Sequence, residues 1–148
     1  MVENSDIYRK LVLDEQKVQR LSADFGLQRD PSLLSVTGMV PKPDDLGYVR
    51  DEVEKTAARY RETSCDAGRL EDTKKALRYG FLMDLETAQG IAFSLIDVVV
   101  PTGGIEAVND YYATLDSIEP KDIQAAADRY LVPGRRTIVT LTAKQEGR

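Results

Sequence analysis

Hydrophobic and polar residues alternate near the start of the chain and later recur every three or four positions, which predicts two strands followed by a run of helices. The first strand is predicted over Val18 to Phe25, where Leu21, Ala23 and Phe25 share one side. The second is predicted over Leu33 to Val40, where apolar residues fall on both sides. We therefore expect the second strand to be the more buried of the two.

Helical spacing is clearest directly after the second predicted strand. The segment Pro41 to Asp45 ends that strand and supplies an Asp cap for a long helix. The apolar stripe of this helix recurs every three or four residues and consists of Leu46, Val49, Val53, Ala57 and Tyr60. A shorter helix, Ile7 to Asp14, is predicted before the first strand, with Ser5 or Asp6 as its cap.

The next predicted helix begins near Asp66. Its Glu71 and Lys75 have the spacing of four residues that lets an ion pair support a helix. Gly80 lies inside the same helix, where the missing side chain would let another backbone approach closely.

The remainder of the chain predicts three more helices and a closing strand. Thr87 caps a helix that is apolar on most sides, so we expect it to be buried or to meet a partner. The segment Pro101 to Gly104 should break this helix, and two short helices follow, the second with Pro120 in its first turn. Residues Arg136 to Ala143 form the predicted closing strand. The inward face of the last helix should hold Ile123, Ala126, Ala127 and Tyr130.

Three strands from the two ends of the chain, with helices between them, predict an α+β fold in which an antiparallel sheet is covered by helices. The 148 residues are enough for one core or at most two small ones, and no repeat or linker demands two domains, so residues 1–148 are expected to form a single domain. Three strands are nevertheless a small platform for so many helices.

The composition limits the chemistry. The chain has no His and a single Cys, so it lacks the two ligand types that zinc sites use most. Cys65 has no His to activate it as a nucleophile, and no loop gathers carboxylates as a calcium site does. We therefore assign no catalytic, cofactor-binding or metal-binding residue to this chain.

Charge and hydropathy bear on the classes of partner. The net charge of -5 argues against a nucleic-acid partner, because such proteins usually carry basic patches. The longest apolar stretch, Ile96 to Val100, contains Asp97 and is far too short to span a bilayer. The N-terminus does not follow the order of a signal peptide, and the sequence assigns no compartment.

The C-terminal part of the chain has a specific order of pieces. A Tyr pair on a short helix is followed by an acidic helix start, an Ala-rich helix ending in Arg-Tyr-Leu, a Pro, a basic turn and a Thr/Val strand. These pieces are Asp110-Tyr111-Tyr112, Glu119 to Ile123, Ala125 to Leu131, Pro133, Arg135-Arg136 and Thr137 to Leu141. This order resembles the insulinase (pitrilysin) metallopeptidases, and Ser5 to Val12 resembles that family's helix before a pair of strands, so the resemblance covers nearly all of the chain.

The resemblance implies the metalloenzyme half-domain fold found in LuxS and mitochondrial processing peptidase. In that family a larger sheet begins with strands that precede the helix placed here at Ile7. We therefore expect the chain to be a fragment of a larger insulinase-like peptidase domain that lacks its N-terminal strands.

The family assembles its active site from two homologous halves. One half carries an HxxEH zinc motif, in which two His hold the metal and the Glu is the general base. The other half supplies an Arg and a Tyr that orient the substrate and stabilise the oxyanion. In this chain Glu15-Gln16 match the family pattern, but Val12 stands in the Arg position and Gln19 in the Tyr position. Arg9 or Arg20 could compensate for the missing Arg and Tyr. A solvated Arg at the end of a helix or strand explains each of them better.

These departures imply a non-catalytic domain that helps enclose a peptide substrate beside a homologous catalytic domain or subunit carrying HxxEH. Zinc is expected in that catalytic half of the parent protein, and this chain alone is expected to be inactive. The alternative is a pseudopeptidase that serves as a structural or assembly module of a larger complex, for which the apolar helix Ala88 to Val100 offers an interface. A third reading is an unrelated small acidic binding domain, favoured if the segments at Val18, Leu33 and Arg136 do not pair as strands.

Overall fold

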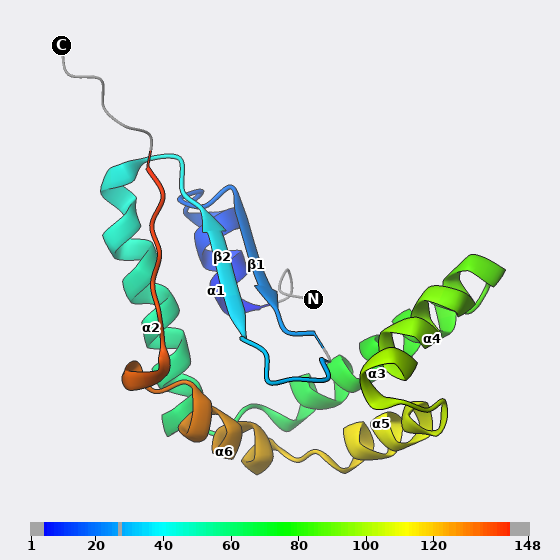
Figure 1. The fold of residues 1–148 in the computed structure, drawn as a ribbon. Helices are drawn as coiled ribbons and strands as arrows, with labels where there is room; N and C mark the ends of the chain where they lie inside the picture. The colour runs from blue at the N-terminus through cyan, green and yellow to red at the C-terminus, as the bar shows by residue number, and fades with distance from the viewer. Residues whose placement is uncertain (1–4, 27, 143–148) are drawn as a thin grey trace. The chain divides into compact units, whose positions relative to one another are not determined.

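A computed structural model describes residues 5–26 and 28–142 of the chain. The described part is α+β, with a two-stranded antiparallel sheet and six α-helices (Figure 1). It divides into two compact units, one with residues 5–23, 36–62 and 126–142, and one with residues 24–26, 28–35 and 63–125. The α+β class is confirmed at this level, and the single-domain organisation stays a prediction.

The first unit is built on a hairpin of strands β1 (Arg20–Asp24) and β2 (Ser35–Met39). Before the hairpin, α1 (Asp6–Tyr8) runs into a π-helix (Arg9–Asp14); after it, a 3₁₀ turn (Pro43–Asp45) leads into α2 (Leu46–Glu62). The core is the cluster in which these pieces meet, and it consists of the buried residues Leu11, Val18, Leu21 and Val49.

The ends of the first helices show which predicted caps formed. The hydroxyl of Ser5 accepts a hydrogen bond of 3.3 Å from the backbone N–H of Tyr8, so the predicted N-cap of the short helix is confirmed. The predicted Asp cap of the long helix is wrong. The 3₁₀ turn before α2 has Lys42 at its N-cap without a side-chain bond, and the Asp45 carboxylate binds Lys17 instead.

The second strand is exposed along its whole length, so the prediction that it is the more buried strand is wrong. Leu21 in β1 is 5% exposed, whereas Val36 and Met39 in β2 are 48% and 59% exposed. The buried side chains of Val18 and Leu21 mark the core face of the hairpin, and on that face Gly38 of β2 offers no side chain to pack. A Cβ at Gly38 would lie 3.7 Å from Leu21 and would add ordinary contact.

The C-terminal part of the first unit follows α6 (Pro120–Tyr130) and a 3₁₀ turn (Pro133–Arg135). Pro120 opens α6 as predicted, but Tyr130 is 57% exposed, and Ala127 alone of the four residues expected to point inward is fully buried. The predicted closing strand is also wrong for its described residues 136–142, which do not join the sheet; Ala143 lies outside the described residues.

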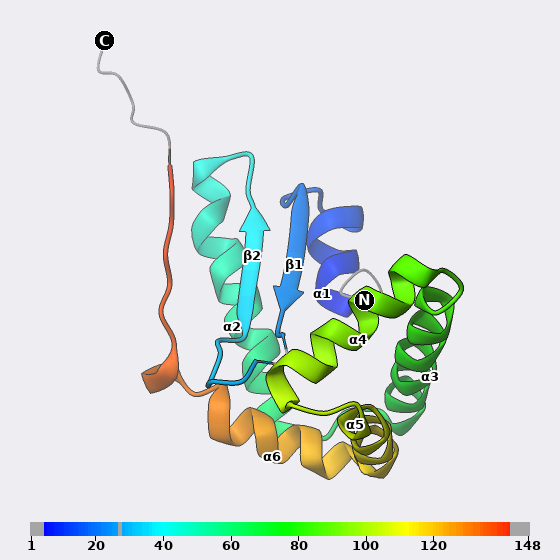
Figure 2. The same ribbon diagram turned by 45° about the vertical axis from the view of Figure 1, so that its right-hand side comes forward.

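The second unit contains three helices, α3 (Ala67–Asp84), α4 (Ala88–Thr102) and α5 (Glu106–Ser117) (Figure 2). Asp66 and Thr87 cap α3 and α4 by accepting backbone N–H bonds of 2.8 Å and 3.0 Å, which confirms the predicted cap at Thr87 and the predicted helix start near Asp66. The ion pair predicted inside α3 forms differently, because Glu71 pairs with Lys74 at 2.8 Å instead of with Lys75.

Close backbone approach in this unit occurs at a different glycine from the predicted one. A Cβ at Gly80 would meet no described atom within 4 Å, whereas a Cβ at Gly90 would lie 1.8 Å from the backbone oxygen of Asp84. Gly90 is therefore the residue that lets the turn between α3 and α4 close. The predicted helix break at Pro101 to Gly104 is confirmed, because α4 ends at Thr102 and Gly103 after it adopts a left-handed φ of 85°.

α4 contains no buried residue. Its apolar side chains are substantially exposed, at 59% for Phe93, 50% for Ile96 and 71% for Val100. The predicted alternative of a buried helix is therefore wrong, and the alternative of a partner stays a prediction. No helix of the described part is by itself long and apolar enough to cross a membrane; α4 and α5 qualify only as a pair that bends by 88° between them.

Candidate functional site

The corner between the π-helix and β1 is the place where the resemblance puts functional residues. The wide π turn is closed by the N–H of Glu15, which bonds to the oxygen of Lys10 at 2.9 Å. The oxygen of Leu11 then accepts from both Lys17 and Val18, at 2.9 Å and 3.1 Å. Gln16 adopts a left-handed φ of 52° and reverses the chain toward the strand. This backbone arrangement could not be predicted from the apolar spacing alone.

Val12 and Gln19, the two positions at which the resemblance led us to look for an Arg and a Tyr, have different surroundings. Val12 is half-buried and packs against the core cluster. The side chain of Gln19 is exposed, and its backbone N–H bonds to the oxygen of Met39 at 2.8 Å. Arg9 and Arg20, the two nearby candidates for compensation, are both exposed. Val12 has no side-chain donor for a developing oxyanion, and Gln19 offers a shorter, neutral amide in place of a phenol.

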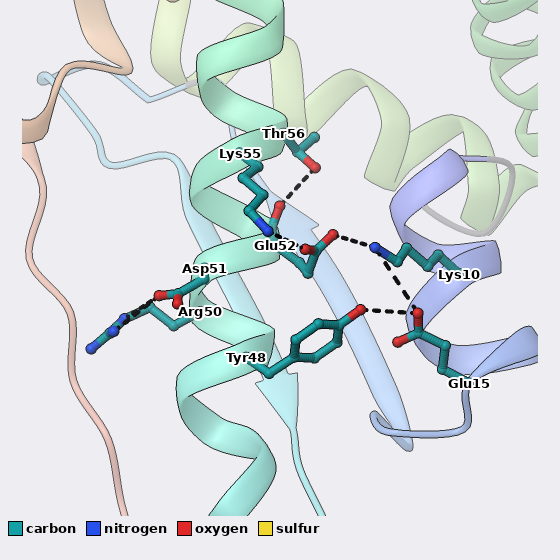
Figure 3. Close-up of polar contacts among 8 residues, drawn as sticks. All are labelled: Lys10, Glu15, Tyr48, Arg50, Asp51, Glu52, Lys55 and Thr56. Atoms are coloured by element: carbon teal, nitrogen blue, oxygen red, sulfur yellow. Dashed lines mark hydrogen bonds and ion pairs between the residues drawn. The ribbon is translucent and has the colours of Figure 1, made fainter.

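A polar cluster next to this corner was not anticipated from the sequence. We call it the Tyr48 cluster, and it consists of Lys10, Glu15, Tyr48 and Glu52 (Figure 3). The Tyr48 hydroxyl donates to Glu15 Oε1 at 2.9 Å, and Lys10 Nζ donates to Glu52 Oε2 at 2.5 Å. Lys10 also lies 4.0 Å from Glu15 and 5.6 Å from the Tyr48 ring centre. The cluster therefore ties the π-helix and the following turn to α2.

The electrostatics of the cluster favour its charged forms. Hydrogen bonds from Lys10 and from Lys55 lower the pKa of the Glu52 carboxyl below its ordinary value. The bond to Glu52 in turn raises the pKa of Lys10 above its ordinary value. Near neutral pH the Glu52 carboxylate and the Lys10 ammonium both stay ionised. Neither group is therefore suited to act as a general acid or base at that pH.

A second ion pair extends the same surface. Lys17 binds Asp45 at the start of α2, and its ammonium lies 4.9 Å from the centre of the Tyr48 ring. The bond to Asp45 raises the pKa of Lys17 above its ordinary value. Tyr48 thus lies between two lysines that are each paired to an acid. One oxygen, Oε2 of Glu15, is buried without a hydrogen-bond partner in the described part of the chain.

A pocket of about 380 Å³ lies between α2 and the C-terminal segment. It is lined by small and charged side chains, which include Ala57, Ala58, Lys55, Arg61 and Arg136. The charges at its rim are engaged within the protein, since Arg136 pairs with Glu54 at 3.1 Å and Arg61 with Asp128 at 3.6 Å. The Arg136 pair fastens the C-terminal segment to α2, and the Arg61 pair fastens α6 to α2, so both have a structural role.

The other residues considered from the sequence do not converge into a reactive site. Cys65 is a free, half-buried thiol. Tyr112 packs its ring 5.1 Å from Phe81, so part of the Tyr pair contributes to packing. Within residues 5–26 and 28–142, no group of three His, Cys, Asp or Glu side chains could hold a metal ion.

The sequence contained a partial signal for the Tyr48 cluster. Tyr48, Glu52 and Lys55 recur at helical spacing on α2, next to the apolar stripe. Their partners Lys10 and Glu15 lie more than thirty residues away in the sequence, and only the fold brings them together. No family model, curated protein or solved structure matches the chain in the comparisons with known proteins.

Proposed function

We propose that this chain is a non-catalytic domain of an insulinase-like zinc endopeptidase, with the half-domain fold of that family. The proposal rests on the order and spacing of the sequence pieces that resemble the family. The observation that carries its non-catalytic character is the helix-to-strand corner, where Val12 packs against the core and Gln19 presents a neutral side chain. The domain would help to enclose a peptide substrate while a separate half supplies HxxEH and zinc.

The Tyr48 cluster supports a positioning role for this corner. Its polar groups bind one another and hold the π-helix against α2. A rigid wall beside a peptide chamber needs such internal pairing, because unpaired buried charges would be costly. The chemistry of cleavage would come from the other half, in which a zinc-bound water is the nucleophile.

The proposal is tested by assaying the chain first alone and then together with the polypeptide that carries HxxEH. The purified chain is assayed for zinc content and for cleavage of a fluorogenic peptide library, and we expect neither zinc nor cleavage. The assay is then repeated with the HxxEH polypeptide encoded in the same or the adjacent gene. We expect cleavage that needs both polypeptides and is abolished by a chelator. Zinc-dependent cleavage by the chain alone would overturn the proposal.

A second candidate is a pseudopeptidase that serves as a structural or assembly module. The exposed apolar surface of α4 favours it, because an apolar patch of this kind marks an interaction site. The same reconstitution distinguishes the two. A stable complex that contains no HxxEH polypeptide and cleaves no peptide would favour the assembly module.

A further inference from the structure

The two compact units differ in how many apolar side chains they bury. The fully buried apolar residues of the first unit are Leu11, Val18, Leu21, Val49 and Ala127. Among the described residues of the second unit, Leu115 is the one fully buried apolar residue, at 8% exposed. Burial of apolar surface is the main term that offsets the entropy lost on folding. The first unit therefore contains most of the core that stabilises the described chain.

The helices of the second unit leave much of their apolar surface in water. No residue of α4 is buried, and on α3 the side chains of Tyr79 and Leu82 are 65% and 62% exposed. An aromatic contact between α3 and α5 joins the rings of Phe81 and Tyr112, whose centres lie 5.1 Å apart. A unit with so little buried apolar surface should have a low free energy of local opening.

Polar contacts add to the contact between α3 and α5. Lys74 of α3 is 7% exposed, and its ammonium donates to the backbone oxygen of Asp116 at 3.1 Å and to Glu71 Oε1 at 2.8 Å. Arg78, one turn further along α3, donates to the Asp116 carboxylate. We call these contacts the Asp116 latch, and it consists of Lys74, Arg78 and Asp116. The latch ties the last turn of α5 to α3.

The two halves of the Asp116 latch should differ in strength. Asp116 lies in the last turn of α5, where backbone carbonyls lack partners within the helix and the helix dipole favours a cation. Lys74 meets that carbonyl from a buried position, where water screens the attraction little. The side chains of Arg78 and Asp116 are 46% and 53% exposed, so water screens their ion pair more strongly. Lys74 is therefore the stronger half.

We propose that the second unit opens as a separate cooperative step while the first unit stays folded, and that the Asp116 latch holds the second unit closed. The small buried core of the second unit makes its opening less costly than that of the first. The latch then sets how often α5 leaves α3. This inference does not depend on the proposed peptidase function.

Native-state amide hydrogen exchange of the full chain, followed by NMR, measures the opening of each helix separately. We expect amides in the middle of α3 and α5 to be protected about a hundredfold less than those in the middle of α2. This comparison in the parent chain needs no variant. Equal protection of the three helices would show a single cooperative unit and would overturn the proposal.

Val49→Ala tests the separation of the two units from the side of the first. Val49 belongs to the buried cluster of the first unit, so its truncation should lower protection in α2 about tenfold. Protection in α3 and α5 should stay as in the parent, because their opening leaves the first unit folded. An equal loss of protection in α2 and α3 would mean that the two units open together, contrary to the proposal.

Lys74→Met tests the latch, with Lys75→Met as the matched control. Methionine keeps an unbranched apolar stem and removes the ammonium, so protection in α3 and α5 should fall about tenfold. Lys75 is the next residue of α3, its side chain is 76% exposed and it lies 3.8 Å from Asp72. Its substitution should change protection by less than about twofold. Equal effects of the two substitutions would overturn the role of the latch.

Discussion

The hydroxyl of Tyr48 donates a hydrogen bond of 2.9 Å to Oε1 of Glu15, which joins α2 to the turn after the π-helix. The two residues are 33 positions apart in the sequence. Oε2 of the same carboxylate is buried without a hydrogen-bond partner among the described residues, so Glu15 relies on Tyr48 for much of its stabilisation. The corner should therefore respond to small changes at this contact.

Tyr48→Phe removes only the hydroxyl and leaves the ring between its two lysines. We expect the free energy of unfolding to fall by about 1 kcal/mol, because Glu15 loses a hydrogen bond in a partly buried place. Urea denaturation followed by circular dichroism measures the change. The control is Tyr79→Phe on α3, where the ring is 65% exposed and the change should stay within about 0.5 kcal/mol. Equal effects of the two substitutions would contradict the assigned role of the Tyr48 bond.

Leu11→Ala tests whether the core of the first unit lies where the π-helix meets the hairpin. Leu11 is 0% exposed, so truncation should lower the free energy of unfolding by about 2–5 kcal/mol through lost burial and a residual cavity. The same change at Leu13, two residues on and 57% exposed, should cost about 0.5 kcal/mol or less. Comparable losses from denaturant curves of both variants would show that the π-helix has a different orientation.

Glu52→Gln should alter the acid limb of the stability curve. The pKa of Glu52 is lowered in the folded state, so its contribution is present above the ordinary carboxyl range and is lost as the pH falls below about 4. The variant should therefore lose less stability than the parent between about pH 5 and pH 3. Denaturation at a series of pH values checks this. Glu62→Gln, at the exposed end of α2, should leave the pH dependence close to that of the parent; an unchanged acid limb in Glu52→Gln would contradict the role of its pairing.

Gly90→Ala and Gly80→Ala form a matched pair in the second unit. A Cβ at Gly90 would lie 1.8 Å from the Asp84 oxygen, so the turn must open and the free energy of unfolding should fall by about 1–3 kcal/mol. A Cβ at Gly80 meets no described atom, and alanine is the better helix former, so a gain of about 0.5–1 kcal/mol is expected there. Thermal melts of the two variants should shift in opposite directions. Shifts of the same sign would contradict this assignment of the two glycines.

Local signals in the sequence were sufficient for the helix starts. Ser5 and Thr87 cap helices as predicted, and a helix begins at Asp66 as predicted, because a cap needs only a side-chain oxygen and a backbone N–H three residues ahead. The same local logic failed at Asp45. Its carboxylate binds Lys17 from another element, and that competing partner cannot be read from the neighbouring residues.

Burial and pairing of strands depended on neighbours that the sequence pattern does not specify. β2 and residues 137–142 have the composition of interior strands, yet β2 is exposed and residues 137–142 join no strand of the described sheet. Alternation shows which side chains share a face, but not what covers that face. For this reason the number of strands and the more buried strand were both predicted wrongly.

The sequence by itself determined the α+β class, the order of the helices and of the first two strands, and the absence of His from any site in this chain. Spacing and composition act locally, and they therefore decide helix, strand and available chemistry. Only the tertiary structure decided that a π turn would bring Lys10 and Glu15 to Tyr48 and Glu52, and that Gly90 instead of Gly80 would meet another backbone. Such contacts join residues that are distant in the sequence or depend on the path of a turn, and the free energy that selects them arises only when the whole chain packs.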